Sequence, residues 1–339
     1  MSRFCSIAVD AMGGDFGPRV TVAASIAALE KHPHLTISLV GHTPSISPFL
    51  TPLNSDIANR IEVVHVDGVI GMEEKPSSVL RNRGETSMSK ALELVAEGQV
   101  SACVSAGNTG ALMVLGRKIL KMLPGIDRPA LISPIPTFKS HSYMLDLGAN
   151  VDTSAHNLLQ FAVMGSVLAE AVDGLNSPRI GLLNIGQEEI KGTESVKEAA
   201  GLLSQSGLNY IGFIEGDDVF GGAVDVIVCD GFVGNIALKS SEGLARLIYK
   251  RVKQEFSRSI WGRMVGVLAR PLLMRIATQL DPTRRNGASL LGLNGSVVKS
   301  HGSATKACFG FAIEQAMAEA EKDVPALIKR QLAEKLVNR

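Results

Sequence analysis

The sequence has few of the residues that mark several common protein classes. It contains four cysteines in 339 residues, Cys5, Cys103, Cys229 and Cys308, and no two of them form a Cys-x-x-Cys pair. We therefore expect neither a disulfide framework nor a zinc site. We expect the protein to occupy a reducing, cytoplasmic compartment. No apolar run reaches the roughly 18 residues that span a bilayer. The N-terminal stretch MSRFCSIAVD also lacks the apolar core of a signal peptide.

Neither sign of charge dominates the chain. Lys and Arg number 34 against 33 Asp and Glu, which gives a formal net charge of +1. The balance predicts no nucleic-acid partner. Hydrophobic residues make up 45% of the sequence, enough for a large core, and no linker or low-complexity segment divides it. We expect a single catalytic unit over residues 1–339.

Short apolar runs alternate with helical patterns along the chain. Seven runs after the initial IAVD (7–10) are typical of strands: 37–40, 61–66, 102–106, 143–147, 179–185, 210–214 and 225–230. Helical patterns occupy 87–98, 156–172 and 194–207, among others. The alternation predicts an α/β fold with a mainly parallel sheet sandwiched by helices.

Six of these strands are followed by glycine together with Asn, Asp, Glu or Lys. The first runs into AMGGDFGP, so that Asp10, Gly13, Gly14 and Asp15 come directly after it. In open α/β sheets, ligands bind beyond the carboxyl ends of the strands. Any one such loop is explained by ordinary turn chemistry, but six strands that are each followed by such a loop favour a shared polar site in one crevice.

The stretch SAGNTGALMVLGRKIL (105–120) combines a strand end, a glycine turn and a helix start. The free N–H groups and the dipole of such a helix suit a phosphate group. The stretch GNIALKSSEGL, which begins at Gly234, offers a second helix start of this kind. The sequence has neither the GxGxxG nor the GxxxxGK[ST] fingerprint at these loops, so no nucleotide cofactor is predicted.

Seven motifs, in order, resemble the bacterial acyl-ACP:phosphate acyltransferase family, often called PlsX. They are VDAMGGDFGP, SAGNTGALM, GIDRPAL, LDLGANVD, LNIGQEEIKG, VCDGFVGNIALK and GASLLGLNGSVVKSHGSA, within residues 7–314. The resemblance implies transfer of a fatty acyl group from acyl carrier protein to inorganic phosphate, giving acyl phosphate for phosphatidic acid and phospholipid synthesis. It also implies a fold like isocitrate dehydrogenase and phosphate acetyltransferase, a homodimer, no cofactor, peripheral membrane association, and delivery of product to a membrane glycerol-3-phosphate acyltransferase.

The chemistry implied by this resemblance needs donors for phosphate and for a tetrahedral oxyanion, and a proton for the leaving thiolate. We expect Lys191 to pair with phosphate or the oxyanion, asparagines to act as amide donors, and aspartates at strand ends to orient Lys191 or move a proton. The catalytic candidates are Lys191, Asn235, Asp230 and Asn150; the substrate-binding candidates are Asp10, Gly13, Gly14, Asn108, Thr109, Gly110, Asp146 and His301.

Several candidates also have a structural interpretation. Lys191 could simply be a solvated lysine paired with Glu188, and His301 a capping or packing histidine. Cys229 could be an acyl-accepting thiol, but a buried cysteine is usually a small hydrophobe. Four acidic residues could hold a divalent cation, although no ligand spacing requires it and we predict no metal; they are Glu188, Glu189, Asp217 and Asp218.

One segment departs from the α/β rhythm. Residues 256–280 contain no acid and four arginines, and helical periodicity gathers their apolar residues on about half of the wheel. We predict a helical arm over 240–285 that contacts an anionic membrane surface; packing against a second subunit and docking of acyl carrier protein stay open. Pro271 is expected to kink or end this helix. The predicted membrane-contact residues are Ile260, Trp261, Met264 and Leu268.

Two other functions stay open at this stage. A dehydrogenase on the related fold is disfavoured by the missing dinucleotide fingerprint. A non-catalytic adaptor for carrier protein or membrane leaves the six polar strand ends unexplained.

Overall fold

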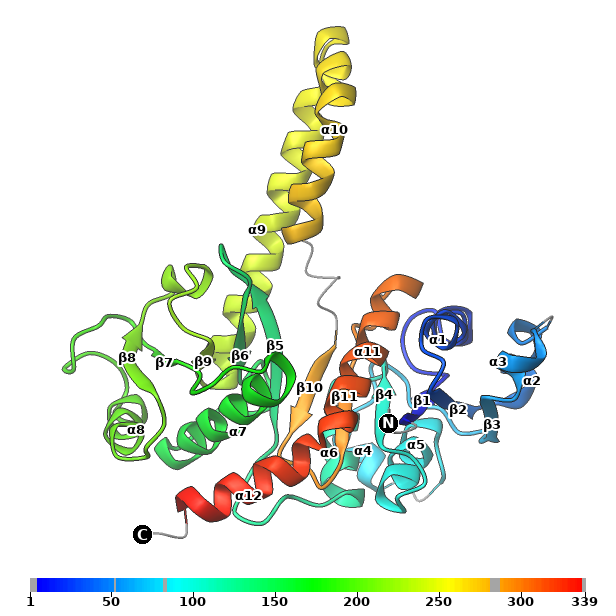
Figure 1. Ribbon diagram of the computed structural model, residues 1–339, viewed down its shortest axis with the longest axis horizontal. Coiled ribbons are helices and arrows are strands. Elements are labelled where there is room, and N and C mark those ends of the chain that lie inside the picture. The colour runs from blue at the N-terminus through cyan, green and yellow to red at the C-terminus, as the bar shows by residue number, and fades with distance from the viewer. Residues whose placement is uncertain (1–4, 52, 82–83, 281–286, 337–339) are drawn as a thin grey trace.

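The computed structural model describes residues 5–51, 53–81, 84–280 and 287–336. Within these residues the strands form an eleven-stranded sheet in the order β3-β2-β1-β4-β11-β10-β5-β6-β9-β7-β8, with helices packed on it (Figure 1). The α/β class predicted from the sequence is confirmed. The strands are β1 (Cys5–Asp10), β2 (Leu35–Gly41), β3 (Ile61–His65), β4 (Ala102–Ser105), β5 (Ala130–Pro136), β6 (His141–Leu145), β7 (Ile180–Leu183), β8 (Tyr210–Ile214), β9 (Val226–Val228), β10 (Ala288–Leu291) and β11 (Ser296–Lys299).

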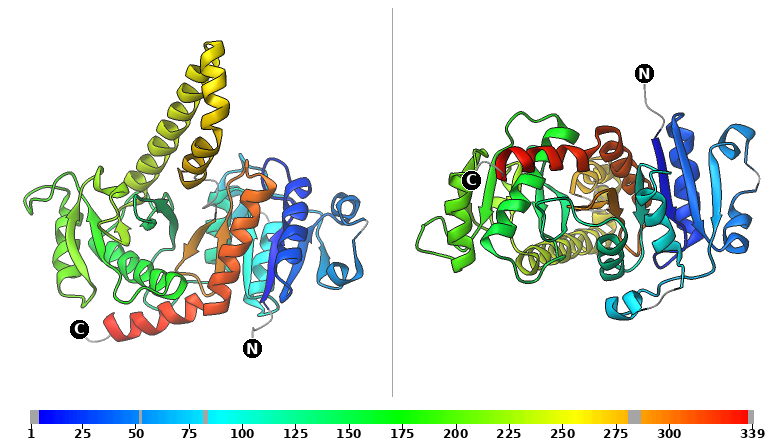
Figure 2. Two further views of the ribbon diagram at one scale, coloured as in Figure 1. Left: turned by 45° about the horizontal axis from the view of Figure 1, so that its top comes forward. Right: turned by 90° about the horizontal axis from the view of Figure 1, so that it is seen from below.

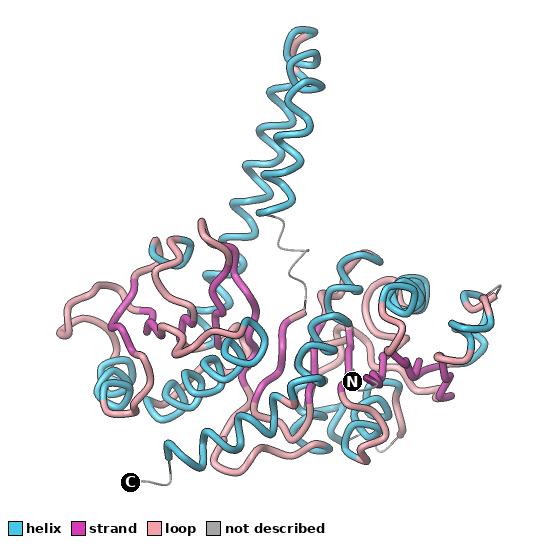
Figure 3. Tube along the Cα trace, in the orientation of Figure 1, coloured by secondary structure: helices cyan, strands magenta, loops and turns pink. Residues whose placement is uncertain are grey.

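Helices and strands occur throughout the body of the molecule (Figure 3), and along the chain most strands are followed by one or two helices. The α-helices are α1 (Pro18–Lys31), α2 (Thr43–Ile46), α3 (Ser55–Ala58), α4 (Pro76–Arg81), α5 (Ser87–Ala96), α6 (Thr109–Ile119), α7 (Ala155–Asp173), α8 (Glu194–Ser204), α9 (Gly231–Ser257), α10 (Ile260–Leu280), α11 (Lys306–Lys322) and α12 (Val324–Leu336), with short 3₁₀ turns at η1 (Ser47–Phe49) and η2 (Asp218–Phe220).

The sheet changes direction near its middle. The strands β1, β2, β3, β4 and β11 pair in parallel, and so do β6, β7, β8 and β9. Between the two sets, the pairs β11–β10, β10–β5 and β5–β6 are antiparallel. Three reversals leave the two sets running in opposite directions, although the sheet is mainly parallel as predicted.

This reversal corrects the prediction that six polar strand ends lie at one edge of the sheet. The ends of β1 and β4 belong to one set, and the ends of β6, β7, β8 and β9 belong to the other. The sequence did not reveal the reversal because the strands that make it are hard to recognise. β5 contains two prolines, which strands usually avoid, and β10 is only four residues long.

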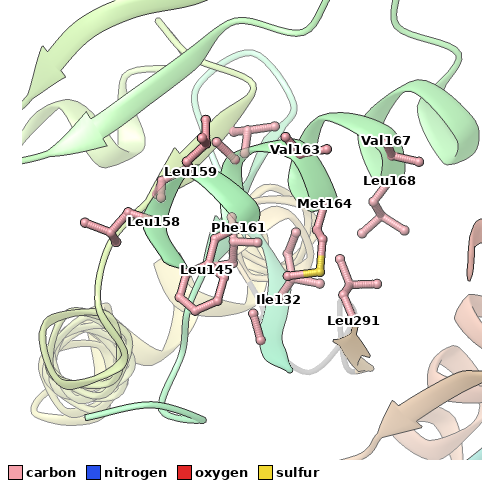
Figure 4. Close-up of a cluster of buried hydrophobic side chains, with 14 of the residues drawn as sticks. Ile132, Leu145, Leu158, Leu159, Phe161, Val163, Met164, Val167, Leu168 and Leu291 are labelled. Carbon is pink, nitrogen blue, oxygen red and sulfur yellow. The ribbon is translucent and has the colours of Figure 1, made fainter. Parts of the chain in front are cut away.

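The core of one half is built around α7, which is buried on nearly every side (Figure 4). A helix that is apolar all round is expected inside a protein and not on its surface. Ser154 caps its start by accepting a hydrogen bond from the N–H of Asn157. At Gly165 the helix approaches the sheet so closely that a Cβ would lie 2.6 Å from Cγ1 of Val226. This contact fixes α7 against β9.

Helices α9 and α10 form a hairpin that projects from the body of the molecule (Figures 1 and 2). The predicted single helix over 256–280 is wrong in its boundary, because α9 continues to Ser257 and α10 begins at Ile260. α10 continues through Pro271 and does not end there. Residues 281–286 of the predicted arm lie outside the described residues.

Candidate functional site

A row of three polar residues crosses three neighbouring strands at their carboxyl ends. In register, Ser105 of β4 pairs with Asp10 of β1 on one side and with Lys299 of β11 on the other. All three are buried. The hydroxyl of Ser105 donates to Asp10 Oδ2 at 2.6 Å and accepts the N–H of Gly107 at 3.0 Å. The row thus holds the loop that leads into α6.

Lys299 is, with Ser105, a residue of this row that was not predicted from the sequence. Its Nζ donates to the carbonyl oxygen of Ala106 at 3.4 Å and to that of Ser300. Burial lowers the pKa of Lys299 to about 8, although the charges of Asp10 and Asp15 oppose this shift. A lysine at the very end of the buried run SVVK was the signal that could have revealed it.

Asp10 is also shifted by its surroundings. Burial raises the pKa of this carboxyl, and the hydrogen bond from Ser105 partly offsets the increase. Within the described part of the chain, Asp10 Oδ1 is buried without a hydrogen-bond partner. A buried lysine and a buried aspartate with shifted pKa values at strand ends are typical of functional sites.

The predicted site glycines Gly13 and Gly14 pack against this row. A Cβ on Gly13 would lie 2.7 Å from both Asp10 Oδ2 and the nitrogen of Gly107, so only glycine fits there. Gly14 has a φ of 86°, which favours glycine. A small hollow beside them is lined by residues that include Gly13, Phe16, Ala106 and Gly302.

Asn108 has a structural role at the start of α6. Its Oδ1 accepts the N–H of Ala111 at 3.0 Å, and its Nδ2 donates to the carbonyl oxygens of Met72 at 2.7 Å and Glu74 at 2.9 Å. The side chain is therefore committed to the cap and to the 71–74 loop. The backbone N–H groups of Thr109 and Gly110 remain the candidates for an anion at this helix start.

Asp146 and Asn150 form a buried, hydrogen-bonded pair in the loop after β6. Asp146 Oδ2 accepts from the backbone N–H of Asn150 at 2.6 Å and from its Nδ2 at 3.0 Å, while Oδ1 accepts from Leu131 at 2.9 Å. Burial nevertheless raises the pKa of Asp146. Asn150 Nδ2 also donates to the carbonyl of Pro129 at 2.8 Å. Because both amide protons are used, we assign Asn150 a positioning role in place of the predicted contact with substrate.

The hydrogen-bonded pair of Asp146 and Asn150 positions the start of α9. The N–H of Gly231 donates to the carbonyl of Asn150 at 2.8 Å. Asp230 caps this helix by accepting the N–H of Val233 at 2.8 Å. Asn235, one turn into the helix, is exposed and lies beside Gly148. Cys229 is buried beneath them, and burial raises the pKa of its thiol well above the ordinary value, which disfavours a thiolate nucleophile.

Lys191 lies in the loop after β7. Its Nζ contacts Glu188 Oε1 at 2.8 Å, and 44% of the side chain is exposed. The hydrogen bond to Glu188 raises the pKa of Lys191 and keeps it protonated. A Cβ at Gly186 would lie 2.4 Å from Lys191 Cδ, so the lysine folds back over that glycine. Lys191 is therefore both the predicted paired lysine and an accessible cation.

Helix α9 connects the two groups of strand ends that the sheet separates. It begins at Asp230 in the second group, and its Lys239 lies close enough to Lys299 and His301 to lower the pKa of both, although burial is the larger cause. Asp230 and Lys239 are about 14 Å apart along the helix axis. His301 itself follows β11, and its Nδ1 lies 3.0 Å from the hydroxyl of Ser303.

The described residues contain neither a metal-binding cluster nor a membrane-spanning helix. No cluster of three or more His, Cys, Asp or Glu side chains there could hold a metal ion. Likewise, no helix in the described ranges has the length and apolar character needed to cross a membrane.

Comparison with known proteins agrees with this architecture. Residues 5–327 match the family described as "Fatty acid synthesis protein". A "Phosphate acyltransferase" from Pseudomonas syringae pv. syringae (strain B728a) is 56% identical over 327 residues, covering 96% of each chain. A phosphotransacetylase structure from Streptococcus pyogenes has a TM-score of 0.61 at 19% identity and covers 93% of this chain and 94% of its own.

The fold is shared more widely than the activity. A 4-hydroxythreonine-4-phosphate dehydrogenase structure from Klebsiella pneumoniae has a TM-score of 0.54 at 16% identity and covers 95% of this chain and 99% of its own. At these identities the solved structures establish the fold alone, which confirms the predicted phosphate-acetyltransferase-like architecture.

Proposed function

We propose, from the premise that this chain belongs to the fatty acid synthesis protein family, that it transfers a fatty acyl group from acyl carrier protein to inorganic phosphate. The product is acyl phosphate, which supplies phosphatidic acid and phospholipid synthesis. The observation that carries this proposal is the 56% identity, over 96% of both chains, with a protein named phosphate acyltransferase. The fold shared with a phosphotransacetylase supports it.

The reaction needs no nucleophile from the protein. An oxygen of hydrogen phosphate attacks the thioester carbonyl carbon, a C–O bond forms, and the tetrahedral oxyanion collapses with cleavage of the C–S bond. The proton of the hydrogen phosphate ends on the departing thiolate, so the products are acyl phosphate and free carrier protein. Burial raises the pKa of the Cys229 thiol and so disfavours a thiolate, which fits this direct attack.

The attacking phosphate and the oxyanion share one carbon, so the proposal requires donors from both groups of strand ends to face one cleft; α9, which carries Asn235 near its start and Lys239 near Lys299, runs from one group to the other. We assign phosphate to the N–H groups of Thr109 and Gly110 at the start of α6, which follow the loop whose Ala106 carbonyl accepts from Lys299. Lys191 and Asn235 are the exposed donors proposed for the oxyanion. Such donors act strongly because they are already oriented when the charge develops.

The test is an assay with purified protein, acyl-ACP and phosphate. Acyl phosphate, trapped with hydroxylamine as the hydroxamate, should form in proportion to free carrier-protein thiol and only when phosphate is present. The absence of both products with wild-type protein would reject the function, whereas consumption of NAD(H) would favour the dehydrogenase.

We also propose that the α9–α10 arm attaches the enzyme reversibly to an anionic membrane surface. The four predicted contact residues are all exposed, at 76% for Ile260, 75% for Trp261, 53% for Met264 and 79% for Leu268. Arginines at 258, 263, 270 and 275 complement anionic lipid. Attachment would bring the apolar product close to a membrane glycerol-3-phosphate acyltransferase. Homodimer formation, also proposed, would cover other apolar parts of the arm.

A further inference from the structure

Three segments that follow strands of the second group, two loops and the start of α9, each place an exposed apolar residue next to a polar one. Val151 follows Asn150, Ile190 precedes Lys191, and Ile236 follows Asn235. The apolar partners are 73%, 84% and 49% exposed, respectively. Two further exposed residues in the same segments are Ile185 at 78% and Phe232 at 56%. The association of a polar residue with an exposed apolar one thus occurs in all three segments.

The strand register places these loops side by side. Val228 of β9 pairs with Leu145 of β6 on one side and with Leu182 of β7 on the other, so the three strands end at the same level. Neighbouring strands lie about 4.8 Å apart. The loops that follow them therefore begin within about 10 Å of one another, and we define their exposed residues Val151, Ile185, Ile190, Phe232 and Ile236 as the apolar band.

We propose that the apolar band binds the acyl chain of the acyl-ACP substrate while Lys191 and Asn235 face its thioester. This inference rests on the proposed function and adds the part of the site that holds the chain. The substrate has a polar reacting carbonyl joined to a long apolar tail, and the loops offer the same two characters next to each other. Exposed isoleucine side chains contribute no hydrophobic free energy while water surrounds them, and an apolar ligand that covers them supplies it.

The band differs in position from Phe138, an exposed apolar residue at the other end of β6. Phe138 is 94% exposed, but it lies in the turn between β5 and β6, at the amino end of β6. The polar candidates lie beyond the opposite end of that strand. Phe138 is therefore a matched control for loss of an exposed apolar side chain.

The experiment compares Ile190→Ser and Phe232→Ser with Phe138→Ser, using acyl-ACP with a sixteen-carbon and a six-carbon chain. The ratio of kcat/KM for the long chain to that for the short chain should fall about tenfold in both band variants, roughly the effect of one lost apolar side-chain contact. Phe138→Ser should keep the wild-type ratio. The proposal is overturned if this ratio keeps its wild-type value in the band variants, whether kcat/KM is unchanged or falls equally for both chain lengths.

Two further measurements keep the outcomes separate. If the band variants become monomeric by light scattering while the chain-length ratio is unchanged, a second copy of the chain covers the band and the proposal fails. If wild-type protein forms no acyl phosphate, the proposed function fails, and binding of non-hydrolysable long-chain and short-chain amide analogues of acyl-ACP then tests the band directly. Selective loss of the long-chain analogue in Ile190→Ser supports the band, and equal binding of both analogues by wild type and variant overturns it.

Discussion

Replacing Lys299 with methionine tests whether a buried charge beneath the α6 loop is held at a cost to stability. The folded-state pKa of Lys299 is about 8, below the ordinary 10.5. Between these pH values the unfolded chain binds more protons than the folded protein, so wild-type stability rises with pH through this window. From pH 7 to pH 10 the gain is about 2.5 kcal/mol at 1.36 kcal/mol per pKa unit. The methionine variant lacks this gain.

The assay is urea unfolding followed by circular dichroism at pH 7 and pH 10. The carbonyls of Ala106 and Ser300 lose their donor in Lys299→Met, which lowers its stability by a similar amount at both pH values. Subtracting variant from wild type at each pH removes that constant. We expect the free energy of unfolding of wild type, relative to that of Lys299→Met, to rise by about 2.5 kcal/mol between pH 7 and pH 10. Parallel pH dependences would refute the reasoning.

The same variant should raise KM for phosphate about tenfold or more, because a cation near the proposed phosphate position is lost. Lys118→Met, at an exposed lysine later in α6, is the control and should leave this KM near the wild-type value.

Three other predictions address the mechanism, the core and the arm. Lys191→Ala should lower kcat about 100-fold, as for loss of an oxyanion donor, while Cys229→Ala stays within about threefold because a thiol nucleophile is not used; the reverse order would revive the acyl-thiol route. Glu319, buried beside Ser289 and Gln315, has a folded-state pKa raised by burial to about 7 from 4.5, so its contribution to stability falls as pH rises across that window. The free energy of unfolding of Glu319→Gln, measured in urea relative to wild type, should therefore rise by about 2.5 kcal/mol between pH 5 and pH 8. If the difference in free energy between variant and wild type is the same at both pH values, the pKa assigned to Glu319 is wrong. In liposome sedimentation, a triple change to glutamine should release the protein from anionic vesicles while acyl phosphate formation continues; retained binding or loss of dimer would point to another role for the changed residues Ile260, Met264 and Leu268.

The sequence was a good guide to the local elements of the fold. Strands such as β4, ACVS, are fully buried short apolar runs, and α7 has a capping serine and a terminal glycine that mark its ends. The reversal of the sheet could not be predicted in this way. It depends on pairings of β10 with β5 and β11, between segments far apart in the chain, and these short strands have no distinctive local pattern.

The site was predictable by position more than by role. The predicted residues lie at strand ends, but Asn108, Asp230, Asp146 and Asn150 use their side chains to cap helices or tie loops. Polar residues favoured at strand ends serve ligands and backbone equally well, and only hydrogen-bond partners distinguish the two uses. The burial of Lys299 depends on tertiary packing, and its position at the end of the apolar run SVVK was the only local indication of it.

The most direct test of the account is the fate of oxygen from labelled phosphate. With acyl-ACP and phosphate carrying ¹⁸O at every oxygen, direct attack of phosphate on the thioester gives acyl phosphate that retains all four labelled atoms, detected by mass spectrometry. Lys191→Ala should give the same labelled product at a much lower rate. Formation of acyl phosphate with only three labelled oxygens, or of free fatty acid with no acyl phosphate, would contradict acyl transfer to phosphate at this site.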